Sequence, residues 1–176
     1  MIENHRNFNL RFYFRALTKI IREPGNFFSN LPADIGLKQP LGFLLVSSLI
    51  YAAACLAGNM PLNPVLFGCI FFINAVGMAF MVTGIGYMLM LMFIGKQVPF
   101  SFFFSVYAFS LGVILLFSWI PFFFWLTEPW KWWLIGTGMT KALGLRWTQA
   151  VLIIIISYAI IALFFWSILP VIFSFT

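Results

Sequence analysis

The sequence contains few of the side chains that carry catalytic or metal-binding chemistry. His5 is its only histidine and stands near the start of the chain, so no serine, cysteine or aspartate is expected to have a histidine that activates it. No phosphate-binding loop motif is present, and the usual metal ligands are too few for a centre. We therefore expect no catalytic, cofactor-binding or metal-binding residues, and a protein that is not an enzyme.

Charged side chains are also scarce. They make up 8% of the 176 residues, against about 25% in an ordinary soluble domain, while 63% of the residues are hydrophobic. A soluble fold of this size would expose long apolar runs to water, whereas lipid accepts them. Cys55 and Cys69 both lie inside such runs, where a thiol usually behaves as a small hydrophobic group. The composition therefore predicts an integral membrane protein.

Four long apolar segments are expected to cross the membrane as helices, because each is at or near the roughly 20 residues that span a hydrocarbon core. They are residues 41–58, 64–95, 100–126 and 147–170. A fifth segment, residues 130–143, is short and contains Lys131 and Lys141. The expected fold class is an all-α membrane bundle of about five transmembrane helices. Residues 41–176 form its transmembrane domain, and residues 1–40 form a cytosolic segment with an amphipathic interfacial helix.

The placement of lysine and arginine indicates whether the fifth segment crosses, because short cytoplasmic loops collect these residues. With five spans and a cytoplasmic N-terminus, nine of the ten cations lie on the cytoplasmic side, whereas with four spans only seven do. We therefore predict five spans, with the N-terminus in the cytoplasm and the C-terminus outside. Glu128 falls in the predicted external turn at residues 127–129, and five of the seven tryptophans surround that turn as an interfacial belt.

A segment near the N-terminus combines an apolar stripe with a basic stripe. Arg11, Arg15, Lys19 and Arg22 recur every three or four residues, which predicts a helix that lies in the membrane surface beside anionic lipid head groups and stops at Pro24. An alternative is that the basic face binds a cytosolic protein partner. The remaining cations are too scattered to form a nucleic-acid patch. The apolar stripe consists of Leu10, Tyr13, Phe14, Leu17, Ile20 and Ile21.

Phenylalanines and small residues suggest how the helices pack. The Phe27-Phe28 pair is expected to insert at the membrane interface, and the Phe triplets at 102–104 and 122–124 are expected to face lipid. Small residues at four-residue spacing, as at Ala75 and Ala79, let helices approach closely. They fit contacts inside one bundle at least as well as a homo-oligomer.

Polar residues inside the predicted spans are few, and no acidic residue lies there. Asn74 and Thr83 in the second span form the possible intramembrane polar site. An asparagine at such a position most often hydrogen-bonds between helices. The alternative is a substrate site near these two residues and the Gly84 and Gly86 step.

Several stretches resemble bacterial members of the Yip (Ypt-interacting protein) domain family. They are REPGNFFSNLP at 22–32, GLKQPLGFLLVSSLI at 36–50, YAFS at 107–110 and GLRWTQA at 144–150. The resemblance covers most of residues 15–170 and implies five spans with a cytosolic N-terminus. Eukaryotic members of that family are associated with prenylated small GTPases. This chain has a much shorter cytosolic region, and Val113 replaces a usual proline, so GTPase binding is not carried over to it.

These observations predict a non-enzymatic scaffold or adaptor that organises partner proteins or lipids. A bacterial plasma (inner) membrane is the expected location, and anionic lipid, a protein partner or a second copy of the chain are the expected partners. The alternative is a small transporter or lipid-handling protein that uses Asn74 and Thr83.

Overall fold

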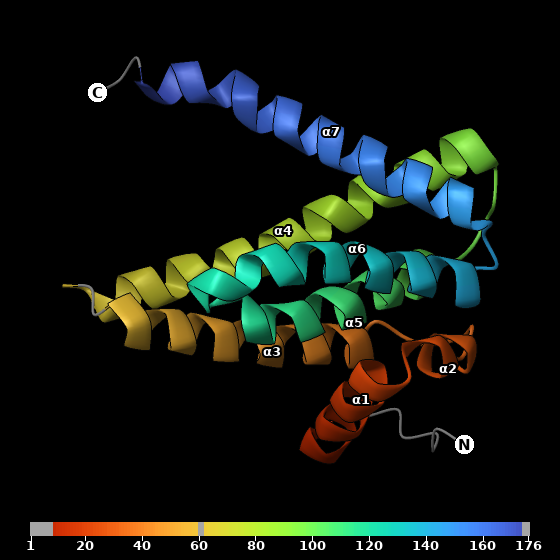
Figure 1. Ribbon diagram of the computed structural model, residues 1–176, viewed down its shortest axis with the longest axis horizontal. Helices are drawn as coiled ribbons and strands as arrows, with labels where there is room; N and C mark the ends of the chain where they lie inside the picture. The colour runs from red at the N-terminus through yellow and green to blue at the C-terminus, as the bar shows by residue number, and fades with distance from the viewer. Residues whose placement is uncertain (1–8, 60–61, 174–176) are drawn as a thin grey trace.

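The structure is a computed structural model that describes residues 9–59 and 62–173. Every regular element in these residues is helical (Figure 1), as the sequence predicted. His5 and the chain end at Thr176 lie outside the described residues. The elements are α1 (Leu10–Arg22), α2 (Pro24–Ser29), α3 (Lys38–Asn59), α4 (Pro64–Ile94), α5 (Phe100–Ser118), the short 3₁₀ helix η1 (Pro121–Phe123), α6 (Phe124–Lys141) and α7 (Trp147–Phe173).

Within the described residues, α3, α4, α5 and α7 are long and apolar enough to cross a membrane. Their bounds match the predicted segments within a few residues, except that α5 ends at Ser118 and not near residue 126. Pro121 explains the early end, because proline lacks the N–H that would continue the helical hydrogen bonds and disfavours helix in the residue before it. The chain passes through η1 and enters α6 at Phe124.

Helix α5 lies at the centre of the bundle and contacts α3, α4, α6 and α1. Its Phe102, Phe103 and Phe104 are buried, so the prediction that this triplet faces lipid was wrong. Composition could not reveal this, because a membrane protein is apolar on its lipid-facing surface as well as in its interior. Close contact with α3 requires Gly112, where a Cβ atom would stand 2.7 Å from a ring carbon of Phe43.

Helix α6 runs antiparallel to α5 along its length (Figure 1). The rings of Phe117 and Trp130 lie 5.7 Å apart near one end, and Val106 contacts Gly138 near the other. Beyond α6, the backbone carbonyl of Leu143 accepts a hydrogen bond from Lys96 Nζ, in the α4–α5 connection. The chain therefore returns to the end of the bundle from which α5 started.

The N-terminal helices α1 and α2 pack against the bundle. Phe27 and Phe28 of α2 are 2% and 0% exposed, and Phe28 lies against Gly138 of α6. The prediction that this pair inserts at the membrane interface was therefore wrong, because the pair fills a space between helices. Helix α1 ends at Arg22, with Glu23 as its C-cap, so the prediction that it stops at Pro24 is confirmed. Pro24 is then the first residue of α2, where a missing N–H costs nothing.

Candidate functional site

Helix α1 is held against the bundle by one face. Asn9 caps it, because its side-chain oxygen accepts a hydrogen bond from the Phe12 backbone N–H at 2.7 Å. Tyr13 is 1% exposed, with its ring 4.8 Å from that of Phe43 in α3 and its hydroxyl 3.1 Å from the Ser47 hydroxyl. Ile20, two turns further on, is fully buried. These contacts fix the orientation of the helix.

The predicted apolar stripe of α1 is divided between two faces. Tyr13 and Ile20 pack on the bundle, whereas Leu10 and Phe14 stay 63% and 62% exposed and Ile21 stays 42% exposed. At about 100° per residue, the exposed apolar residues lie between the docked face and the basic face. The helix therefore has three faces, one for protein, one apolar and one cationic, and not the two that the sequence predicted.

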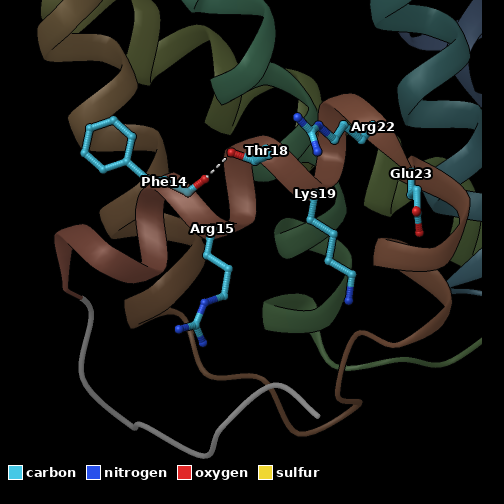
Figure 2. A pocket seen from close by; sticks show the side chains of 6 residues that line it. All are labelled: Phe14, Arg15, Thr18, Lys19, Arg22 and Glu23. Atoms are coloured by element: carbon cyan, nitrogen blue, oxygen red, sulfur yellow. Dashed lines mark hydrogen bonds between the residues drawn. The ribbon is translucent and has the colours of Figure 1, made fainter.

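The cationic face consists of the four predicted residues. Arg11, Arg15 and Arg22 are exposed and Lys19 is partly buried, and none of the four forms an ion pair with a described residue. Arg15, Lys19 and Arg22 line an open hollow of about 560 Å³, together with Phe14, Thr18 and Glu23. Figure 2 shows these six side chains.

This hollow can bind a large anion without a deep pocket. Its guanidinium and ammonium groups supply several N–H donors and positive charge, which suit phosphate oxygens. The exposed Phe14 ring offers an apolar surface at its edge. A phospholipid presents both kinds of chemistry, because its phosphate lies next to its acyl chains.

The docking contact stays uncharged at ordinary pH. Burial raises the pKa of the Tyr13 hydroxyl above its usual value, and the hydrogen bond with Ser47 partly opposes this shift. The neutral hydroxyl can both donate and accept, which suits a hydroxyl partner such as Ser47.

The second predicted site is not assembled as expected. Thr83 is fully buried, but its hydroxyl donates to the Ala79 carbonyl of its own helix at 2.6 Å. Asn74 stands nine residues earlier on α4, about 13 Å along the helix axis. It is exposed on the protein surface and not the buried polar group that the sequence indicated. The two residues therefore do not share a site.

Asn74 instead contributes to a cavity of about 230 Å³ that all five long helices line. The lining is apolar for the most part, with Met78 and Val82 among its residues. Each long helix supplies at least one polar side chain. These are Tyr51 from α3, Asn74 from α4, Ser118 from α5, Glu128 and Lys131 from α6, and Tyr158 from α7.

An ion pair occupies one wall of the cavity. Lys131 Nζ lies 2.6 Å from Glu128 Oε1 and 5.2 Å from the centre of the Tyr158 ring, a cation–π distance. The Lys131 side chain is 13% exposed and that of Glu128 31%. Residues 127–129 belong to α6, so the prediction of a turn at Glu128 was wrong. The i, i+3 spacing of the two charges was the sequence signal that could have placed them on one helix.

Exposed tryptophans surround this end of the bundle. Trp125 is 84% exposed, and Trp119, Trp132 and Trp133 lie between 43% and 47%. Trp132 also contacts Tyr158 across the α6–α7 interface, with ring centres 5.3 Å apart. Indoles in such positions typically lie at the level of lipid head groups.

Comparison with known proteins gives no relative from which a function could be transferred. No family model, no curated protein and no solved structure matches the chain. The basic face of α1 and the cavity between the long helices are therefore the two candidate functional sites of the described residues.

Proposed function

We propose that the protein is a non-enzymatic scaffold of a bacterial plasma membrane, whose docked N-terminal helix binds anionic lipid head groups at the cytoplasmic surface. The observation that carries this proposal is the three-faced arrangement of α1. A helix that only filled a groove in the bundle would need no unpaired cationic row. A helix bound to lipid alone would not need Tyr13 and Ile20 buried against protein.

The depth of α1 favours lipid over a cytosolic protein as the partner of its basic face. Tyr13 packs on Phe43 and Ser47, five and nine residues from the start of α3, or about 7 and 13 Å along that helix. Interfacial helices bury their apolar face about 5–10 Å into the boundary between head groups and acyl chains. Leu10 and Phe14, exposed beside the cations, can therefore contact acyl chains.

A five-span topology with a cytoplasmic N-terminus and an external C-terminus belongs to the same proposal. Helix α6 has 18 residues, about 27 Å, which is close to the thickness of a hydrocarbon core. The hydrogen bond from Lys96 to the carbonyl of Leu143 joins two connections that this topology puts on the cytoplasmic side. The Yip-domain resemblance implies the same topology. A protein partner, or a second copy of the chain, would then be recruited by the lipid-bound surface.

The test compares two triple variants that remove the same charge. One replaces Arg11, Arg15 and Arg22 with glutamine; the other replaces three exposed cations elsewhere, Lys38, Lys141 and Arg146. Each basic residue near an anionic leaflet contributes about 1 kcal/mol, so the α1 variant should lose up to about 3 kcal/mol of binding, roughly a hundredfold. The measurement is the phosphatidylglycerol retained by the protein in native mass spectrometry from lipid discs. Equal losses in both variants would show that only overall charge matters and would refute the proposal.

A transport or lipid-handling function is the second candidate, and the cavity beside Asn74 favours it. The polar lining and the ion pair have no equivalent in a bundle that serves only as an anchor. Replacement of Asn74 by alanine should then reduce flux in liposomes while the protein stays folded, and unchanged flux would exclude Asn74 from such a pathway.

A further inference from the structure

The ion pair between Glu128 and Lys131 lies in surroundings where charges are costly. Ionisable side chains in transmembrane segments are rare and usually face a cavity or the bundle interior. The pair is a weak stabiliser, because the loss of hydration offsets much of the attraction between its charges. Stability alone therefore does not explain its position beside an open volume.

The pair leaves hydrogen-bonding capacity that a guest can use. An ammonium has three N–H donors and an ionised carboxylate has two acceptor oxygens. Within the described residues, Lys131 donates one hydrogen bond, to Oε1 of Glu128. Two N–H groups of the lysine and the second oxygen of the glutamate are left, and Asn74 and Tyr51 add donors and acceptors from the facing helices.

The charge balance of the cavity selects the kind of guest. The pair is neutral overall, so a guest with a net charge would introduce an uncompensated charge between walls that are mostly apolar. A zwitterion avoids this penalty, because its anionic group can approach Lys131 while its ammonium approaches the free oxygen of Glu128. The volume of about 230 Å³ equals that of about seven or eight water molecules, which suits a head group and not a whole lipid.

The surroundings point to a membrane source for that guest. Lys131 is followed directly by Trp132 and Trp133, both exposed, which typically mark the head-group level. A second, wholly apolar hollow of about 480 Å³ runs along α4 beside α7 and is lined by Met81, Met88 and Ile160, among others. Ile160, which lines this hollow, is followed in the sequence by Ile161, which lines the cavity. Figure 1 shows α7 diverging from α4 toward its C-terminal end.

We propose that the cavity binds the phosphoethanolamine head group of a phospholipid, with the acyl chains along the apolar hollow of α4. The phosphate accepts hydrogen bonds from Lys131 and Asn74, and the primary ammonium donates to Glu128. A phosphocholine head group has the same net charge but no N–H on its quaternary nitrogen, so it cannot make the contact with Glu128. This proposal does not depend on the basic face of α1.

The experiment measures retained lipid by native mass spectrometry after reconstitution in equal amounts of phosphatidylethanolamine and phosphatidylcholine. The wild-type protein should retain the ethanolamine lipid preferentially. The double variant Glu128→Gln with Lys131→Met removes both charges at similar volume, and its preference should fall about tenfold or more. The matched control, Asp34→Asn with Lys141→Met, changes the same charges at exposed positions and should behave as the wild type.

Three results would overturn the proposal. The wild type could retain the two lipids equally, a measurement that stands even if the double variant does not fold. The double variant, folded, could keep the wild-type preference. Soluble phosphoethanolamine could displace the lipid completely at comparable concentration, which would show that the cavity takes a free zwitterion and that the acyl chains contribute nothing.

Discussion

Replacement of Gly86 by alanine tests a close contact between α4 and α5. A Cβ atom at this position would stand 2.6 Å from the hydroxyl oxygen of Tyr107, 3.2 Å from the ring carbon that carries it and 3.5 Å from Phe103. Tyr107 is only 1% exposed, so its ring cannot swing into open space. The methyl group must therefore displace a packed ring or separate the helices.

The expected loss of stability follows from two opposing effects. Overpacking of a well-filled interior typically costs about 1–3 kcal/mol, whereas replacing glycine by alanine inside a helix gains roughly 0.5–1 kcal/mol. We expect a net destabilisation of about 1–2 kcal/mol. The Tyr107 hydroxyl has no hydrogen-bond partner among the described residues, so Tyr107→Phe should cost little by itself and should restore most of the stability of the Gly86→Ala variant.

The assay is reversible unfolding by SDS in mixed micelles, with helicity followed by circular dichroism. Gly84→Ala is the matched control, because it lies two residues away on the same helix and has no atom within 4 Å of its would-be Cβ. It should be neutral or stabilising by up to about 1 kcal/mol. If Gly84→Ala and Gly86→Ala have the same effect, or if Tyr107→Phe gives no rescue, the proposed contact between Gly86 and Tyr107 is refuted.

Two further predictions concern the N-terminal helix and the topology. Tyr13→Phe should weaken the docking of α1 by about 1 kcal/mol, because it leaves the Ser47 hydroxyl without its partner. Burial raises the pKa of the Tyr13 hydroxyl, so the contribution of Tyr13 to docking is complete below about pH 10 and declines as the pH rises further. Above that pH, a spin label at Thr18 should gain mobility in the wild type and change less in Tyr13→Phe. In a background without native cysteines, Leu62→Cys and Lys141→Cys should react with an impermeant maleimide from opposite sides of the membrane, and labelling from the same side would mean that α6 does not cross.

The sequence located most of the helices but not the way in which they pack. Length and apolarity located α3, α4 and α7, and the basic periodicity located α1, because these features depend on local composition. The direction in which an aromatic side chain packs does not depend on local composition. Phe28 and Phe103 were both assigned to the membrane, yet both are fully buried. In a soluble chain, polar residues would have marked the outer face of each helix, but lipid removes that contrast.

The candidate sites also differ in whether a single helix or the packing of several helices forms them. The four cations of α1 were identified because charge periodicity is visible in one helix alone. Asn74 was identified as a polar residue in an apolar run, but its partners come from other helices. Lys131 and Tyr158 are 27 residues apart in the sequence and 5.2 Å apart in space, so no local pattern could have joined them. The proline at 129 also suggested a turn, whereas α6 continues through it.

Helix α6 is the fifth span of the proposed topology and also carries the proposed lipid site. Three charged residues, Glu128, Lys131 and Lys141, set it apart from the four helices that are apolar enough to cross a membrane. Lys141 stands at its last turn, where a cation interacts favourably with the helix dipole and can reach the head groups. The other two charges cancel each other and line the cavity. Glu128 and Lys131 line the cavity between the helices, whereas Trp132 and Trp133 of the same helix are exposed. The low apolarity of α6 therefore fits the proposed lipid site, and it does not argue against a fifth crossing.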